Sequence, residues 1–428
     1  MPQIKPEAES FTSIKVIGVG GCGGNAIDHM IDMGLKGVEF IVVNTDAQDL
    51  HYCKANEKIH IGKNATRGLG AGMDPELGRQ SAEENKEELA KMLDGADMVF
   101  ITGGKGGGTC TGAAPFIAEL ARSAGALTIA IVTRPFSFEG SQRAQIALEG
   151  IEDLKGNVDS LVVIHNDRVL NIIDRNTSLN KAFSIVDNIL LQAVQGISDL
   201  ITLPGIINVD FADVKAIMKN SGAALIGFGE ASGDDRAVEA AKMAVNSPLV
   251  EMSINGAKRL LFSVSGGSDI GMSEINKAAE VITSCIDPDA KIIFGAFNDN
   301  KIEKGVLRIT IIATGFDREI ISDNKIREVR EIYKINDDKN DFNSIKKIEK
   351  DENNTEKKNI FKRNERVNDF IEEDIDLEVD ILGGSSEVNY NNKNKESDLL
   401  KDNSLLDSED NEDELSIPTF IRNKMKRK

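Results

Sequence analysis

Short apolar runs alternate with longer segments of helical periodicity along the first 165 residues. The runs are continuous, which is typical of strands buried on both faces of a parallel sheet. They occupy residues 14–19, 38–43, 96–101, 127–132 and 160–164. Segments with helical spacing separate them, including an acidic one from Pro75 to Leu93. This alternation predicts an α/β fold with a parallel sheet that helices cover on both faces.

The pattern changes after residue 178. From 179 to 202 apolar residues recur at helical spacing, which predicts one long central helix of about 30 Å. Residues 203–316 are predicted to form a smaller β-rich α+β domain with two or so helices. Its strands are expected at 223–227, 259–264, 291–296 and 307–313.

The ends of the chain differ in composition from this folded part. Residues 1–11 are expected to be a flexible N-terminus before a first domain at 12–178. Residues 317–411 are rich in Asn, Asp, Glu and Lys, and so poor in apolar groups that a disordered acidic linker is predicted. Apolar residues return within 412–428, before the basic end KMKRK. A short apolar peptide on a long tether is typical of a docking motif, and a segment without function is the alternative.

The most unusual stretch is ITGGKGGGTCTG at 101–112, between the strand at 96–101 and a helix expected at 113–124, with Pro115 close to its start. Glycines leave backbone N–H groups uncovered, and the first N–H groups of a helix lack internal partners. Both suit a phosphate, and Thr109 and Thr111 add hydroxyls. A tight surface turn is the alternative, but it needs only one or two glycines.

Two further glycine clusters precede this one. Gly18, Gly20 and Gly23 satisfy G-x-G-x-x-G between a strand and a helix expected from Ala26, a weak signal that dinucleotide-binding folds share. The loop at 67–72 supplies a third cluster. Asp46 follows a strand, at the edge where ligands gather in open α/β sheets. We therefore expect the three loops to converge on one site.

Composition excludes several classes of protein. The formal net charge of −19 argues against a nucleic-acid partner, because nucleic-acid binding relies on basic residues. No uncharged apolar run reaches the roughly 18 residues that a membrane span needs. The start MPQIKPEAES lacks the features of a secretory signal, so a cytoplasmic location is expected. The four cysteines and four histidines are dispersed, so neither disulfides nor a metal site is expected.

Six motifs in order, GVGGCGGNA, NTDAQ, GLGAG, GGGTCTG, TRPFSFEG and NVDFADV, resemble those of the FtsZ family of tubulin-like cell-division GTPases. The resemblance covers 12–316 and the C-terminal peptide. It implies a Rossmann-like GTPase domain, a central helix and a smaller β-rich domain. It also implies a homopolymer of head-to-tail protofilaments in the division ring at mid-cell.

The resemblance further implies which residues bind GTP or GDP. Glu139 would reach the ribose, and Arg143 the phosphates or sugar. Asn166 and Asp187 would read the guanine edge while Phe183 stacks on the base, although helix core is the alternative for Phe183. The implied phosphate-binding and supporting positions are Gly20, Gly21, Cys22, Gly23, Gly24, Asn25, Asp46, Gly70, Ala71, Gly72, Gly106, Gly107, Gly108, Thr109, Cys110, Thr111, Gly112, Thr133 and Pro135.

In the family, carboxylates of the next subunit polarise the attacking water. The matching residues here are Asp210 and Asp213, with Asn208 beside them. Their spacing of three places both carboxylates on one helical face. Without the family, Asp210 is an N-cap and Asp213 a first-turn acid that the helix dipole favours, and both interpretations can hold together.

Cofactors and partners follow from the same resemblance. Mg²⁺ is expected with the nucleotide, and a monovalent cation such as K⁺ is allowed. The peptide at 412–428 would bind membrane-anchoring and regulatory division proteins, so membrane contact would be indirect. Its matching residues are Leu415, Ile417, Pro418, Phe420 and Arg422.

Three positions depart from the family pattern: Cys110 replaces a glycine, Lys105 an uncharged residue and His165 a proline. A left-handed backbone at 110 would disfavour cysteine by roughly 1–2 kcal/mol, whereas a first helical turn would tolerate it. A thiol at a helix N-terminus is expected to have a lowered pKa. Lys105 either adds a cation near the phosphates or, as is commoner for a lone lysine, points to solvent.

Three function classes remain open from the sequence. The favoured one is a polymerising GTPase whose site forms between subunits. The second is a structural filament protein of the same family that binds nucleotide and barely hydrolyses it. The third is an NAD-dependent dehydrogenase, which G-x-G-x-x-G and Asp46 would fit. A dehydrogenase explains neither the loop at 101–112 nor NVDFADV, so it ranks last.

Overall fold

The computed structural model describes residues 12–316 except 171, 172, 175, 176, 248–253, 255 and 300. The described residues belong to one compact unit. Ten strands lie in the order β3-β2-β1-β4-β5-β6-β7-β10-β8-β9. Their bounds are β1 Ile14–Val19, β2 Glu39–Asn44, β3 Glu57–His60, β4 Met98–Gly104, β5 Leu127–Arg134, β6 Ser160–His165, β7 Gly222–Ser232, β8 Arg259–Gly266, β9 Lys291–Asn298 and β10 Val306–Thr314.

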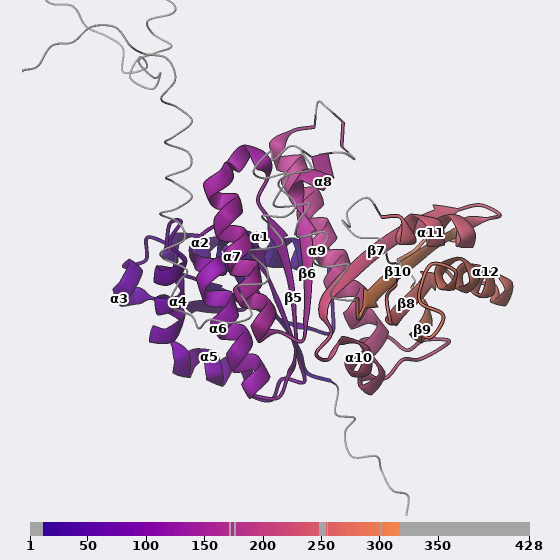
Figure 1. Cartoon of the computed structure of the whole chain (residues 1–428), viewed down its shortest axis with the longest axis horizontal. Helices are drawn as coiled ribbons and strands as arrows, with labels where there is room; N and C mark the ends of the chain where they lie inside the picture. Colours follow the sequence, from indigo (N-terminus) through magenta and orange to yellow (C-terminus); the bar gives the residue numbers. More distant parts are fainter. Residues whose placement is uncertain are drawn as a thin grey trace, which may run out of the picture. The chain divides into compact units, whose positions relative to one another are not determined.

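Helices and loops connect the strands (Figure 1). Their bounds are α1 Gly20–Asp32, α2 Ala47–Tyr52, α3 Lys63–Thr66, α4 Pro75–Glu84, α5 Lys86–Leu93, α6 Thr109–Ser123, α7 Ser141–Asn157, α8 Asn166–Leu170, α9 Leu179–Thr202, α10 Phe211–Met218, α11 Arg236–Val245 and α12 Met272–Thr283, with a short 3₁₀ helix at Ser137–Glu139.

The first six strands are all parallel, as the sequence predicts. Their carboxyl ends therefore share one edge, where β1 leads directly into α1 and β4 into the loop before α6. Each following helix returns the chain along the sheet, so the loops at this edge lie next to one another. This edge holds the functional site described below.

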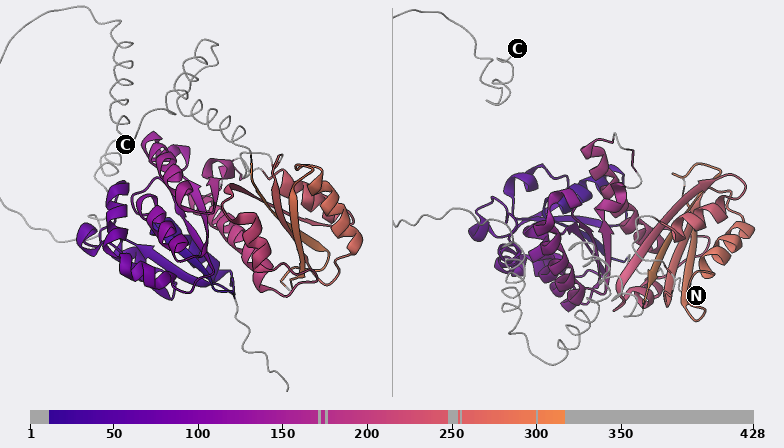
Figure 2. Two further views of the ribbon diagram at one scale, coloured as in Figure 1. Left: turned by 60° about the horizontal axis from the view of Figure 1, so that its bottom comes forward. Right: turned by 45° about the horizontal axis from the view of Figure 1, so that its top comes forward.

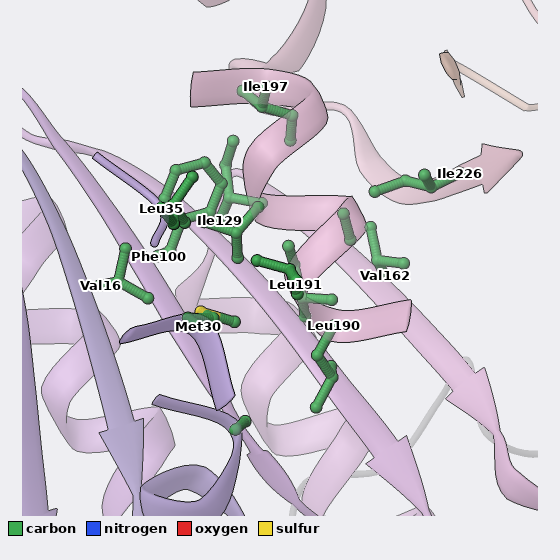
Figure 3. Close-up of a cluster of buried hydrophobic side chains, with 14 of the residues drawn as sticks. Val16, Met30, Leu35, Phe100, Ile129, Val162, Leu190, Leu191, Ile197 and Ile226 are labelled. Atoms are coloured by element: carbon green, nitrogen blue, oxygen red, sulfur yellow. The ribbon is translucent and has the colours of Figure 1, made fainter. Parts of the chain in front are cut away.

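The core beneath the site packs α1 and α9 against one face of the sheet (Figure 3). Val16, Phe100 and Ile129 from three adjacent strands meet Leu190 and Ile197 from α9, and all five are buried. A second cluster packs α4, α5 and α6 on the opposite face. The helices on both faces explain why the strands are continuously apolar instead of alternating.

Helix α9 also packs on the C-terminal strands. A Cβ on Gly196 would lie 2.6 Å from Cγ2 of Thr310 in β10, so the backbones approach closely. Strand β10 runs antiparallel to β7 and β8, whereas β8 and β9 are parallel, which makes this half mixed. Helices α11 and α12 lie together on one side of these strands (Figures 1 and 2). A β-rich α+β region is thus confirmed.

Three predicted helix boundaries were wrong. The acidic segment 75–93 is two helices, since Asn85 leaves the helical region at φ −105° and ψ 25°. Helices α1 and α6 begin at Gly20 and Thr109, not at Ala26 and Ala113. Glycine's low helix propensity argued against helix there, but packing beside the sheet outweighs it. Pro115 consequently lies inside α6 and not at its first position.

The predicted domain boundaries at 178 and 202 do not correspond to a break in the sheet. Strand β6 pairs with β7 at Ser160–Gly222 and Leu161–Ala223, so the sheet is continuous from β3 to β9. The domain boundaries at 12–178, 179–202 and 203–316 therefore stay a prediction about folding units. Across the described ranges, no helix is both long enough and apolar enough to span a bilayer.

Candidate functional site

A cleft of about 760 Å³ opens at the carboxyl edge of the parallel strands. Its size falls within the roughly 300–1,000 Å³ of ordinary ligand sites. It is lined by Val19, Gly20, Gly21, Cys22, Asn25, Asp28, His29, Asp32, Gly72, Gly104, Lys105, Gly107, Gly108, Thr109, Cys110, Thr133, Pro135, Glu139, Arg143, Asn166, Asn180, Phe183, Ser184 and Asp187. Residues from all three glycine clusters are present, which confirms that the clusters converge.

The first wall of the cleft is the start of α1. The N-cap residue Val19 has no side-chain cap, and Gly20 has φ +72°, which favours glycine. The leading N–H groups of α1 are therefore free of a capping side chain and lie at the positive end of the helix dipole. Gly23 packs against Gly18 and Thr102, where a Cβ would meet backbone atoms. The G-x-G-x-x-G glycines thus serve close packing of α1 on β1 and β4.

The second wall is the start of α6, which likewise lacks a side-chain cap at Gly108. A Cβ on Gly107 would meet nothing within 4 Å, so this backbone faces open space in the cleft. A Cβ on Gly108 would instead lie 2.6–2.9 Å from three carbonyl oxygens of the loop at 71–74. Two helix starts therefore present uncovered N–H donors to one cavity, an arrangement that suits a phosphate chain.

The third glycine loop is held against α6 and β2. The Gly108 N–H donates to the Gly72 carbonyl at 2.7 Å, and the hydroxyls of Thr45 and Thr109 lie 2.7 Å apart. Asp46 does not line the cleft: its carboxylate caps α2 by accepting from the N–H groups of Gln48 and Asp49. Helix capping alone therefore explains the acidic residue after β2, and a contact with a ligand is not needed to explain it.

The opposite end of the cleft has the features of a base pocket. Phe183 is 40% exposed and lies edge-to-face with Phe136 at 5.5 Å, so it is not ordinary helix core. Oδ1 of the buried Asn166 has no hydrogen-bond partner among the described groups. Burial raises the pKa of Asp187 to about 6, and His29 opposes this rise. An aromatic face, a free amide oxygen and a desolvated carboxylate fit a ring with N–H donors.

Glu139 and Arg143 bind each other between the two ends of the cleft. Arg143 Nη1 donates to Glu139 Oε2 at 2.6 Å, one helical turn apart, and the Phe136 N–H donates to Oε1 at 2.9 Å. The sequence prediction placed each on the nucleotide and missed this pair. The ion pair fixes the orientation of the carboxylate that the prediction assigns to the ribose.

The structure corrects two expectations about the loop at 101–112. Lys105 does not point to solvent: it is 3% exposed, and its Nζ donates to the Cys110 carbonyl at 3.3 Å. Cys110 is the second residue of α6 and has no left-handed backbone, so its β-carbon carries no conformational penalty. Its pKa is raised by burial, against a smaller lowering by Lys105, so the predicted reactive thiolate was wrong.

A second thiol belongs to the cleft. Cys22 is exposed within it, next to the hydroxyl of Thr133, yet the surrounding walls raise the pKa of this thiol to about 12. Asp187 and Glu139 act in the same direction. Both cleft cysteines are therefore neutral thiols near neutral pH.

The predicted catalytic acids lie outside the cleft. Asp210 caps α10 by accepting from the Asp213 N–H at 2.8 Å, which confirms the N-cap interpretation. Asn208 Oδ1 accepts from the Gly205 N–H at 2.6 Å and so shapes the loop before α10. None of these three residues lines the cleft, although they share one end of α10. A single subunit therefore does not bring them to the site.

Several predicted residues support the cleft without lining it. Thr111 accepts from the Gly106 N–H at 3.0 Å, and Gly112 allows α6 to approach α4. The others in this group are Gly23, Gly24, Asp46, Gly70, Ala71 and Gly106. The peptide residues Leu415, Ile417, Pro418, Phe420 and Arg422 lie outside the described residues, as do 1–11 and the linker.

Helical spacing would have found most of the lining residues that the prediction missed. Asp28, His29 and Asp32 continue the face of α1 that Asn25 begins, and Asn180 and Ser184 flank Phe183 on α9. Residues three or four apart on a helix lie on the same surface, so each predicted lining residue implied others one turn away. Three omissions remain: Val19 and Gly104 are strand ends, and Lys105 follows the second of these strands.

Comparison with known proteins places this geometry in a family. A model described as the Tubulin/FtsZ family GTPase domain matches residues 13–174, and one described as the FtsZ family C-terminal domain matches 222–317. An FtsZ dimer from M. jannaschii is 45% identical, covers 72% of this chain and 89% of that chain, and has a TM-score of 0.69. This chain belongs to the FtsZ family.

More distant structures agree on the fold. CetZ2 from Haloferax volcanii, solved as a GTPγS-bound protofilament, is 22% identical with a TM-score of 0.64, covering 76% of this chain and 99% of that chain. CetZ1 from the same organism, solved as a GDP-bound monomer, is 20% identical with the same TM-score, covering 75% and 98%. The cleft of this FtsZ-family chain thus lies in a tubulin-like GTPase domain, and the dehydrogenase alternative is set aside.

Proposed function

We propose that this FtsZ-family protein binds GTP in the cleft and hydrolyses it between subunits of a head-to-tail protofilament. The polymer would form the division ring in the cytoplasm at mid-cell. One observation carries the proposal: the phosphate-binding helix starts and the acidic end of α10 both exist in this chain, yet a single subunit keeps them apart. A second copy is needed to unite them.

The binding roles follow from the geometry of the cleft. The N–H groups at the starts of α1 and α6 hold the phosphates, with Gly107 giving the closest open approach. Glu139, oriented by Arg143, accepts from the ribose. Asp187 accepts from guanine N1 and N2, Asn166 offers its unpaired Oδ1, and Phe183 covers the ring. Adenine lacks that pair of donors, so guanine is preferred.

Hydrolysis needs a positioned water and stabilised charge more than covalent chemistry. Asp213 and Asp210 of the next subunit orient the water for attack on the terminal phosphate. The uncovered N–H donors at α1 and α6 stabilise the charge that develops. Mg²⁺ would arrive with the phosphates and neutralise part of their charge, since the described residues contain no cluster of acids, His and Cys that would hold a metal alone. A monovalent cation such as K⁺ would neutralise more of this charge.

Exposed apolar side chains occur beside both halves of the proposed site. Leu69 is 84% exposed in the loop that contacts α6, and Ile206 is 58% exposed in the loop before α10. A single exposed apolar side chain is common on a protein surface. Leu69 and Ile206, however, lie on the two surfaces that a head-to-tail contact would join. Burial of both would couple polymer formation to completion of the site.

The decisive experiment measures GTPase rate against protein concentration. A site formed between subunits predicts negligible turnover below a threshold and a steep rise above it, whereas a site within one subunit predicts a constant rate per molecule. Mixing Asp213→Ala with Asp187→Ala sharpens the test. Filaments that join an intact cleft to an intact α10 should hydrolyse faster than either variant alone, and a merely additive rate would contradict the proposal.

The structural-filament alternative predicts assembly without phosphate release in the same assay. That alternative depends on a backbone penalty for cysteine at position 110. Cys110 is helical and its thiol packs beside Gly103, so this penalty is absent. Active turnover is therefore the favoured outcome.

We further propose that the peptide at 412–428 docks on membrane-anchoring and regulatory division proteins through its apolar residues and Arg422. Membrane contact would then be indirect, because a single short peptide without a lipid anchor binds bilayers weakly. Removal of 412–428 should abolish recruitment to the division site while GTPase activity of the purified protein is retained. Loss of both activities would instead assign the peptide to polymer formation.

A further inference from the structure

Lys105 is a buried lysine in the loop between β4 and α6. Lys105 is one of the residues that line the cleft, and it is 3% exposed. Within the described part of the chain, Lys105 forms no ion pair, and its side chain donates a hydrogen bond to the Cys110 carbonyl alone. Buried charges in proteins are normally paired, because an isolated one loses its hydration without compensation.

The surroundings make this cation more unfavourable still. It lies at the first turn of α6, the positive end of a helix dipole, which disfavours a second positive charge. Burial lowers the pKa of Lys105, while Cys110 and the more distant Asp153 of α7 oppose the shift. The Cys110 thiol is itself neutral because burial raises its pKa. Among the described residues no carboxylate contacts Lys105 directly, because Asp153 acts on it without a hydrogen bond or ion pair.

We propose that the missing anion is the phosphate chain of the bound nucleotide, so that Lys105 acts as a specificity residue favouring triphosphate over less charged ligands. The inference rests on the proposed GTP site. The helix start that carries Cys110 is one of the two whose N–H groups face the cleft, so phosphates bound there and Lys105 Nζ would share one turn of α6. Charges separated by a single turn interact strongly where water is excluded.

A purely structural role is the competing explanation. Pro115 lacks an N–H, so α6 loses the hydrogen bond that would reach back to the Thr111 carbonyl. A lysine donating to the preceding carbonyl, that of Cys110, would stabilise this weakened turn. Such a brace would affect every ligand of the cleft equally and would also stabilise the empty protein.

The test compares Lys105→Met and Lys105→Gln with the wild-type protein by titration calorimetry, using GTP, GDP and guanosine. Lys91→Met, an exposed lysine on α5, is the control for the loss of one charge. Charge-assisted contacts predict about tenfold weaker GTP binding in both Lys105 variants, a smaller loss for GDP and less than twofold for guanosine. Lys91→Met should match wild type with all three ligands.

Thermal unfolding supplies an independent readout. Removing an unmatched buried charge should raise the midpoint of the empty Lys105→Met protein and shrink the increase that GTP produces. A brace predicts the opposite sign for the empty protein. Equal losses for GTP and guanosine, or unchanged GTP affinity, would overturn the inference while leaving GTP binding by the wild type intact. Failure of the wild type to bind GTP would overturn the proposed function as well.

Discussion

The side-chain Oδ1 of Asp210 accepts a hydrogen bond from the backbone N–H of Asp213 at 2.8 Å. The bond fixes the first turn of α10 and uses one oxygen of Asp210. Asp213 is partly exposed, and among the residues that the structure describes its carboxylate takes part in no hydrogen bond or ion pair. The two acids therefore have different roles within the subunit. Asp210 caps α10, and the Asp213 carboxylate is available to a neighbouring molecule.

Asp213→Ala should bind GTP and assemble while hydrolysing at least about tenfold more slowly, because one water-orienting carboxylate is lost at each subunit contact. Its thermal midpoint should be unchanged. Asp210→Ala should also be slower and lose about 1 kcal/mol of stability through the N-cap. Phosphate release, sedimentation and thermal melts measure the three effects. Normal turnover by assembled Asp213→Ala would remove this residue from the mechanism.

GTP affinity should depend on the ionisation of Asp187. Its pKa is about 6 in the empty cleft, and guanine binding requires the carboxylate. Affinity should therefore fall about fivefold between pH 6 and pH 5, since the proton must leave first and the ionised fraction falls from about one half to about one tenth. Asp199 is the matched control: burial raises its pKa to about 6 too, but it lies outside the cleft. Asp199→Asn should keep the pH dependence, and Asp187→Asn should lose it along with affinity.

The same shift has a consequence for stability. Because the folded pKa of Asp187 lies above its unfolded value near 4, the stabilising contribution is present below pH 4 and is lost as pH rises through 6. At pH 7.5 the ionised carboxylate is therefore a net cost, and Asp187→Asn should raise the free energy of unfolding by about 1–2 kcal/mol. Chemical denaturation without nucleotide measures it, and a destabilised variant would contradict the desolvation argument.

Two adjacent glycines should respond differently to the same substitution. Gly107→Ala adds a methyl group in open space, so unfolding should be unaffected while phosphate access is blocked and GTP affinity falls. Gly108→Ala would press a methyl group against the carbonyls of Ala71, Gly72 and Asp74, so it should destabilise the loop contact before any ligand binds. Melts and GTP titrations of the pair separate the two effects; similar melting temperatures would refute the distinction.

Cys110 should resist alkylation at neutral pH in the presence and absence of GTP. It is buried, and burial raises the pKa of its thiol, so little reactive thiolate forms. Cys285, partly exposed after α12, serves as the accessible reference thiol in the same protein. Peptide mapping after brief iodoacetamide treatment should find Cys285 modified and Cys110 intact. Labelling of Cys110 that GTP suppresses would restore the reactive thiol that the sequence favoured.

Much of the fold was predictable because hydrophobic periodicity reports local burial. The continuous apolar runs predicted the parallel strands, and the spacing of Val186, Ile189, Leu190, Ala193 and Val194 predicted α9. The helix starts at Gly20 and Thr109 were not predictable, since glycine propensity points away from helix and only packing on the sheet stabilises it there. The burial of Lys105 was not predictable for the same reason, because it depends on packing in the folded protein.

By itself the sequence determined the order of strands and helices, the three glycine loops and the acids at 210 and 213, because each is encoded by neighbours in the chain. Only the tertiary structure decided which side chains meet. It buried Lys105, paired Glu139 with Arg143, freed Asn166 Oδ1 and kept Asp213 out of the cleft. These relations depend on elements far apart in sequence, whose contacts form when the sheet and its helices pack.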